Sequence, residues 1–218
     1  LAAGANAFGA ATIGLRNIAF GFNAMSGVTT GQADDNIAIG NSALLGSAST
    51  SGNGNVAVGV YAADALTTGA CNVSIGTTSL SASTSGCLNI AIGSTALGAS
   101  VTGKTNIAIG TTAMGGADTT ADSNIAIGTF TMDALTSGAC NIAMGLNALG
   151  AATDNCDNIA IGQAALAASV NDGDNNIAIG KTAMGGADVS GASNIAIGLN
   201  AADAITSGAE NVAIGPNA

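Results

Sequence analysis

The sequence predicts an all-β protein, namely a parallel β-solenoid (β-roll) of about twelve coils with 17 to 19 residues in each coil. Three observations support this prediction. One pentapeptide recurs along almost the whole chain, bulky residues alternate with small ones inside it, and a glycine ends each copy before a helix could form. A single coil of this size cannot bury its own apolar face, so neighbouring coils are expected to stack and to pair their backbones in parallel.

The pentapeptide is Asn-[Ile/Val]-[Ala/Ser]-x-Gly, in which the fourth residue is Ile, Val, Met or Phe. Its copies begin at Asn17, Asn36, Asn55, Asn72, Asn89, Asn106, Asn124, Asn141, Asn158, Asn176, Asn194 and Asn211. The array therefore covers residues 17–218 as one continuous domain without a linker. Residues 1–16 are expected to be an irregular first coil or the continuation of an upstream region.

Two short extended segments are predicted in each unit, one at the pentapeptide and one at a small-then-apolar step such as Thr95-Ala96-Leu97. Ile37 and Ile39 alternate with Ala38, so the bulky residues share one face. Ladders of Ile and Val are expected to fill the inside of the stack. The alanines are expected to point outward as a smooth apolar stripe that a partner buries: Ala38, Ala91, Ala108, Ala126, Ala160 and Ala178.

Two other residue types recur in every coil and are predicted to be structural. The Asn side chains are expected to form a ladder in which each amide bonds to the amide one coil away. These residues are Asn36, Asn55, Asn72, Asn89, Asn106, Asn124, Asn141, Asn158, Asn176 and Asn194. The glycines are expected to supply a tight corner or a positive φ, and they include Gly40, Gly93, Gly110, Gly128, Gly162 and Gly180.

A longer period lies on top of the coil repeat. Residues 55–123 and 124–193 align over four coils each, and the aromatic residues Tyr61 and Phe130 recur 69 residues apart. Tandem duplication of a four-coil block lengthens a shaft without changing its design. The two aromatic residues are expected to plug the corner of a coil.

The composition excludes several classes of function. The chain has no His, so a Ser-His-Asp triad and a His metal site are impossible. Its three basic residues, Arg16, Lys104 and Lys181, cannot form a phosphate-binding surface, so no nucleic acid is expected as a partner. No apolar run approaches the roughly 18 residues that a spanning helix needs, so membrane insertion is not expected either. We expect no cofactor and no enzymatic activity.

The four cysteines form two pairs, Cys71 with Cys87 and Cys140 with Cys156, each with a spacing of 16 residues. Because that spacing is close to one coil, each pair is a candidate disulfide between adjacent coils in an oxidising setting. Free thiols that pack as small hydrophobes are the alternative.

The acidic residues cluster in the loops before the repeated Asn. Asp172 and Asp174 are weak candidates for a calcium site because they offer two carboxylates within three residues. Solvated carboxylates that maintain solubility are the favoured interpretation.

Repeats of the form Asn-Ile-Ala-Ile-Gly-x-x-Ala-Leu, seen here at Asn36-Ile37-Ala38-Ile39-Gly40 and its counterparts, resemble the head repeats of YadA-like trimeric autotransporter adhesins. They are still more similar to the Asn-x-Ala-Ile-Gly arrays in tail fibres of bacteriophages and related bacterial surface proteins. The similarity covers residues 17–218. In those families the arrays form parallel β-rolls that assemble as trimers, so the resemblance implies a homotrimer.

The expected function is a structural shaft or head segment of an extracellular fibre, located in a virion tail fibre or on a cell surface. It would mediate attachment to a host or surface through a cell-surface receptor or a glycan. Two alternatives stay open: a filament subunit that assembles end to end, and a solenoid that binds ice or glycan. The second alternative would be favoured by a regular Thr or aromatic array, and the sequence lacks one.

Overall fold

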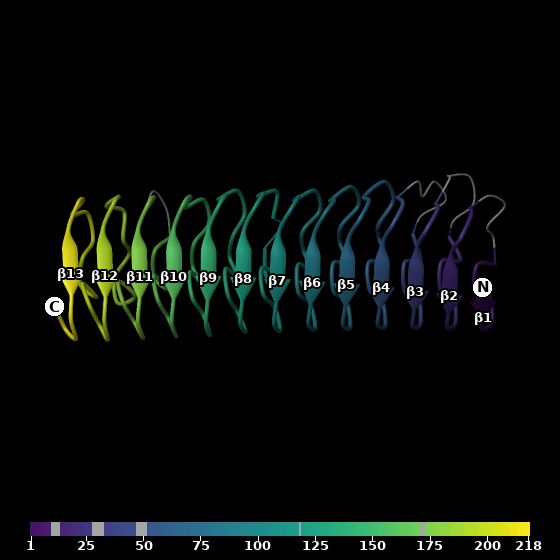
Figure 1. Cartoon of the computed structure of the whole chain (residues 1–218), viewed down its shortest axis with the longest axis horizontal. Coiled ribbons are helices and arrows are strands. Elements are labelled where there is room, and N and C mark those ends of the chain that lie inside the picture. The colour runs from purple at the N-terminus through teal and green to yellow at the C-terminus, as the bar shows by residue number, and fades with distance from the viewer. Residues whose placement is uncertain (10–13, 28–32, 47–51, 118, 171–172) are drawn as a thin grey trace.

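The computed structural model of the chain confirms the predicted parallel β-solenoid. The structure describes residues 1–9, 14–27, 33–46, 52–117, 119–170 and 173–218. Thirteen strands form one sheet in sequential order, β1 to β13, and every pair of neighbours is parallel. The strands stack side by side along a rod with the two termini at opposite ends (Figure 1).

Each strand is short, and β2 to β13 consist of the residues that follow the repeated Asn. The strands are β1 (Ala2–Ala3), β2 (Ile18–Phe20), β3 (Ile37–Ile39), β4 (Val56–Val58), β5 (Val73–Ile75), β6 (Ile90–Ile92), β7 (Ile107–Ile109), β8 (Ile125–Ile127), β9 (Ile142–Met144), β10 (Ile159–Ile161), β11 (Ile177–Ile179), β12 (Ile195–Ile197) and β13 (Val212–Ile214). Equivalent residues pair without a shift, as in Ile125 with Ile142 and Ala126 with Ala143. The first coil obeys the same rule, because Ala2 pairs with Ala19.

The prediction of two extended segments in each coil is wrong. The second segment, such as Thr95-Ala96-Leu97, is a series of turns, and no second strand occurs in any coil that the structure describes. Its backbone repeatedly enters the left-handed region, with φ of 59° at Thr95 and 49° at Leu97. Two left-handed residues so close together reverse the chain sharply, which explains why the segment cannot run on as a strand.

The prediction of which side chains fill the interior is also wrong. Ala126 and the equivalent strand alanines are fully buried, whereas Ile and Val on either side of them are half-buried or exposed. The alanines therefore point into the coil and do not form an outer stripe. The correction applies to all six predicted positions: Ala38, Ala91, Ala108, Ala126, Ala160 and Ala178.

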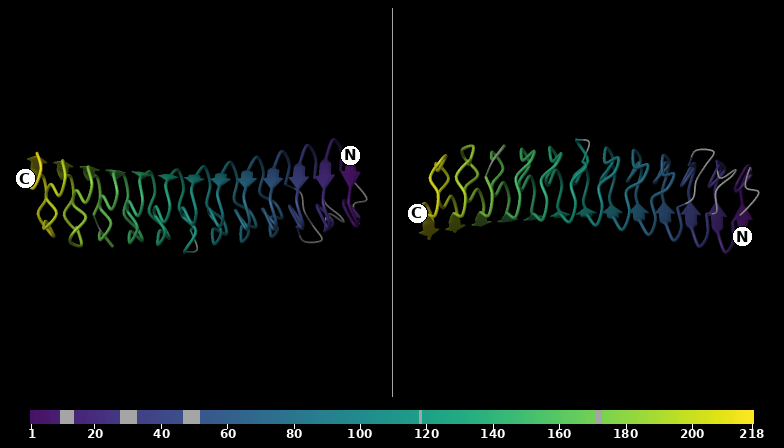
Figure 2. Two further views of the ribbon diagram at one scale, coloured as in Figure 1. Left: turned by 90° about the horizontal axis from the view of Figure 1, so that it is seen from below. Right: turned by 90° about the horizontal axis from the view of Figure 1, so that it is seen from above.

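The interior accepts alanine because the turn segment supplies the large side chain of each coil. Leu97, Leu149 and Leu166, each the eighth residue after its Asn, have no exposed surface and belong to the same buried cluster as the strand alanines. The return segment of a coil buries one or two large side chains, as with Met132 and Leu135, against the small strand residue, in agreement with the close packing of protein interiors. The strands thus occupy one side of the rod, as the views from below and above show (Figure 2). Their bulky residues point away from the interior of the coil.

Candidate interaction surface

The repeated Asn residues form the predicted ladder, which runs from Asn17 to Asn211, and all of them except Asn211 are buried. At all eleven steps the side-chain Oδ1 of one Asn accepts a hydrogen bond from the backbone N–H of the next, at 2.8 to 3.0 Å. Most steps add a second bond between the amides, as from Asn141 Nδ2 to Asn124 Oδ1 at 3.0 Å. The ladder fixes the start of β2 to β13, and its side chains from Asn17 to Asn194 are buried and therefore offer no polar group to a ligand.

The repeated glycines have a backbone that other residues resist, as predicted. Gly128 has a φ of 138°, and a Cβ placed on it would lie 2.6 Å from the carbonyl oxygen of Gly145 on the next coil. The glycine therefore permits both the corner after the strand and the close approach of adjacent coils.

A continuous apolar surface covers the outer side of the sheet. We call it the strand face and define it as the first and third residues of β2 to β13. These residues are Ile, Val, Phe and Met only, and none of them is fully buried. Ile39, Ile75, Ile161 and Ile197 have 37 to 43% of their surface exposed. No residue of any of the thirteen strands carries a charge.

The apolar surface extends beyond the strands at several coils. Val60, Tyr61, Phe130, Leu146 and Leu199 follow the glycine that ends a strand, and they are 41 to 48% exposed. The expectation that Tyr61 and Phe130 plug a corner of the coil is therefore wrong. They stand at the rim of the strand face, once in each four-coil block.

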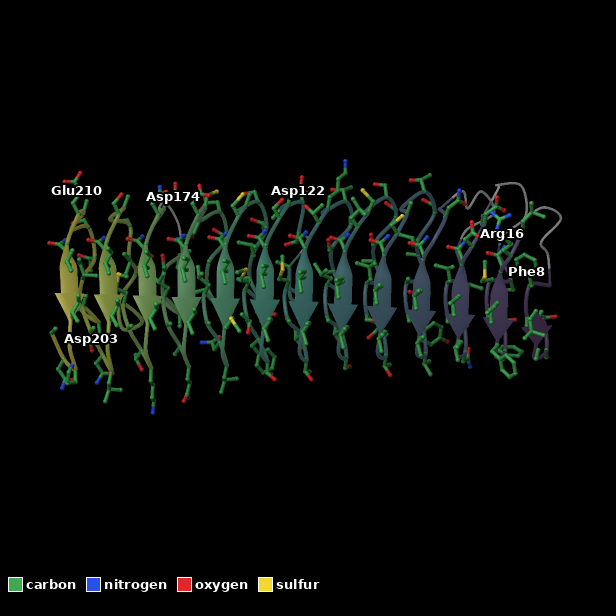
Figure 3. All side chains as sticks on the ribbon, in the orientation of Figure 1. Phe8, Arg16, Asp122, Asp174, Asp203 and Glu210 are labelled. Carbon is green, nitrogen blue, oxygen red and sulfur yellow. The ribbon has the colours of Figure 1, made fainter. Side chains whose placement is uncertain are left out.

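The charged side chains that Figure 3 labels lie away from the strand face. The labelled residues Arg16, Asp122, Asp174 and Glu210 occupy one edge of the rod, beside the loops that precede the strands, and Asp203 occupies the opposite edge (Figure 3). A surface that is apolar along its whole length is thus bordered by charge on both sides.

Loop carboxylates bind the backbone of the preceding coil. Oδ1 of Asp122 accepts from the N–H of Lys104 at 2.7 Å, and Oδ1 of Asp174 accepts from the N–H of Cys156 at the same distance. Asp174, one of the calcium candidates, thus joins two coils, while Asp172 lies outside the described residues. Within the described ranges there is no cluster of three or more His, Cys, Asp or Glu side chains that could hold a metal ion.

The described residues form one ion pair, at the N-terminal end. Nε of Arg16 donates to Oδ1 of Asp35 at 2.5 Å, and Nη2 donates to Oδ2 at 2.8 Å. The hydrogen bond from Arg16 lowers the pKa of Asp35 from its usual value. Both side chains are exposed, so the pair contributes little to stability.

Two other carboxylates are held in a less favourable environment. Burial raises the pKa of Asp64 and of Asp133 above the usual value, and Oδ1 of each has no hydrogen-bond partner among the described residues. They occupy equivalent places in the two four-coil blocks. Nothing in the sequence distinguished them from the solvated loop acids.

The four cysteines are free thiols in the structure, two exposed and two half-buried. Cys71 directly precedes Asn72, whereas Cys87 precedes Asn89 by two residues, so the paired positions differ by one in register. The same offset applies to the second pair, Cys140 and Cys156. The predicted disulfides between coils stay a prediction, which alkylation of the unreduced protein followed by mass measurement would test.

The predicted site residues that the structure describes therefore have structural roles. The strand face, which is the candidate interaction surface, was not predicted from the sequence. A signal for it was present: Ala occurs at both the second and the seventh position after most Asn residues, and Leu or Met follows at the eighth. Because those three side chains point into the coil, the Ile residues on either side of the strand Ala point outward.

No family model, no curated protein and no solved structure matches this chain. Across the part of the chain that the structure describes, no helix is both long and apolar enough to pass through a membrane. The fold itself defines the chain as a parallel β-solenoid repeat protein.

Proposed function

We propose that the chain is a structural shaft or head segment of an extracellular fibre, such as a phage tail fibre or a surface adhesin. The observation that carries this proposal is the unbroken register of the stack, in which thirteen strands pair residue for residue. Twelve steps of about 4.8 Å give a rod about 58 Å long. Such a rod holds a binding tip at a distance from its base.

The attachment role would belong to side chains that vary between coils. The two residues after each repeated Gly differ from coil to coil, and they include Thr129, Gln163 and Lys181. A cell-surface receptor or a glycan would meet this variable edge, while the Asn ladder and the interior stay constant beneath it.

Immunogold electron microscopy tests the proposed location. Antibodies against the purified segment should label thin fibres on the outside of the producing cells or on released virions. Pre-immune serum provides the control. Label confined to the inside of intact cells would contradict the proposal.

A filament that grows end to end is a second candidate. Among the described strands, β1 and β13 each pair on one side only, so each has a free edge of backbone groups. Electron micrographs of the purified chain would then show rods in multiples of about 58 Å. Rods of a single length would exclude the filament.

A further inference from the structure

We propose that two copies of the chain pair face to face through the strand face, with the aliphatic columns of one copy packed on those of the other. The interaction surface is the strand face, and its occupant is a second copy of this chain. The pairing would be the same wherever the fibre is located.

The strand face leaves a large apolar surface exposed. The strand face is about 58 Å long and about 10 Å wide, which is a footprint of nearly 600 Å². The largest apolar patch on an ordinary monomer is about 300 to 600 Å², and such a patch is often a binding site. An aliphatic surface at the upper end of that range is expected to be covered.

The area that two strand faces would bury together is large enough for a stable pair. Two such faces would bury about 1,200 Å² together, the lower limit for specific protein interfaces. The interface therefore has the size of a specific complex without any rearrangement of the chain.

Only a partner with the same spacing between strands can contact the strand face along its whole length. Side chains on the strand face recur at the spacing of neighbouring strands, about 4.8 Å along the rod. A second copy has the same spacing and therefore stays in step over the full length. A partner with another spacing would match only a few strands.

The distribution of charge is compatible with the same occupant. The protein has a net charge of −10, so two copies repel each other wherever their acids meet. The strand face has no charged residue, and the labelled acids lie at the two edges of the rod (Figure 3). Pairing through this face brings two acidic molecules together while their carboxylates remain in water.

Geometry favours two copies over three. Packed sheets lie about 10 Å apart, so each face of a pair is about 5 Å from the central plane. Three flat faces at that distance from a three-fold axis would need to be about 17 Å wide to meet at their edges, and a three-residue strand spans only about 10 Å. A pair covers the face completely, whereas a trimer would leave open corners.

Light scattering of the full chain and of two matched variants tests the proposal. The face variant carries Ile75→Lys, Ile161→Lys and Ile197→Lys on exposed positions of the strand face. The control variant carries Ser137→Lys, Ser190→Lys and Ser207→Lys on exposed positions of the return segments, outside the strands. Both variants change the net charge by the same amount.

We expect the unmodified chain and the control variant to have twice the mass of one 20.3 kDa chain, and the face variant to have the mass of one chain with an unchanged β circular dichroism spectrum. A monomeric or trimeric unmodified chain would overturn the proposal, as would a face variant that still pairs. If the lysines prevent folding, Ile→Thr at the same three positions keeps the β-branched shape. Those changes should raise the dissociation constant at least about a hundredfold, and an unchanged constant would refute the pairing.

Discussion

At the scale of single residues, the buried Asn is the side chain on which most of the coil depends. Oδ1 of Asn124 accepts from both nitrogens of Asn141, and its Nδ2 donates to the carbonyl of Gly138 at 3.0 Å. Because these partners are buried, water cannot replace the lost side chain.

Asn124→Ala should therefore lower the free energy of unfolding by about 3 kcal/mol or more, since it leaves several buried groups without partners. Urea unfolding followed by circular dichroism measures this loss. Asn147→Ala is the matched control, because Asn147 is exposed and Ala164 occupies the equivalent place in the next coil with the same φ of 56°. An equal loss in both variants would contradict the proposed role of the ladder.

Asp64 and Asp133 predict a pH dependence of stability. Their pKa values are raised by burial, so the folded state holds more protons than the unfolded state just above pH 3.8. Stability from these groups is therefore complete below pH 3.8, the unfolded value, and is lost as the pH rises through the folded pKa.

The double variant Asp64→Asn, Asp133→Asn should be more stable than the unmodified chain at pH 7, by no more than about 1 kcal/mol for each site. At pH 3 the gain should disappear. Urea unfolding at the two pH values measures the difference. Asp203→Asn is the control, because Asp203 occupies the equivalent place in the third block and is exposed. A gain of equal size at both pH values would contradict the assignment.

At the scale of the single coil, the strand and the turn segment have different structural roles. The strand supplies backbone pairing and small side chains, and the turns supply the large buried side chain. Leu149 and Leu146 lie in the same turn segment, yet Leu149 has no exposed surface while Leu146 is 48% exposed.

Leu149→Ala should cost about 2 to 5 kcal/mol in unfolding free energy, because it leaves a cavity in the interior. Leu146→Ala should cost less than about 1 kcal/mol in the stability of the isolated chain. Thermal or urea unfolding of both variants measures the contrast. A larger cost for Leu146→Ala than for Leu149→Ala would contradict the assignment of Leu149 to the interior.

Some features of a coil can be predicted from its sequence and others cannot. The alternation of Ile125 and Ile127 with Ala126 correctly predicts a strand with two different faces. It does not determine which face points inward, because that depends on the side chain across the coil, and the turn segment places a leucine or methionine there. The left-handed conformation at residues such as Leu149, with a φ of 50°, is equally hidden, since leucine has no preference for it.

The repeated Asn and Gly were predictable for the opposite reason. Their role is local: an amide bonds to the same amide one coil away, and a glycine adopts a φ that few other residues accept. A role that depends only on contacts between equivalent residues of adjacent coils can be predicted from the sequence of a single coil. The strand face, in contrast, could be predicted only if it were already known which side chains of the strand and the turn segment fill the interior.

At the scale of the whole molecule, the four-coil blocks make the length of the rod adjustable. Deletion of residues 55–123 joins Gly54 to Asn124 and removes β4 to β7. Every remaining Asn of the repeated pentapeptide keeps its place before a strand. The shortened chain should fold with nine strands, because each coil contacts only its neighbours. Small-angle X-ray scattering should show a rod shorter by about 19 Å. An aggregated or unfolded product would contradict this modular view.

The Asn ladder also gives the rod a direction. Every Oδ1 in it accepts from the coil that follows in the sequence, so all the amide dipoles point the same way along the axis. Aligned amides polarise one another, and each bond strengthens its neighbours. A single chain is therefore an electrically polar rod, with the oxygen ends of its amides directed toward the C-terminus. In two copies that lie antiparallel the two dipoles cancel, whereas in parallel copies they add.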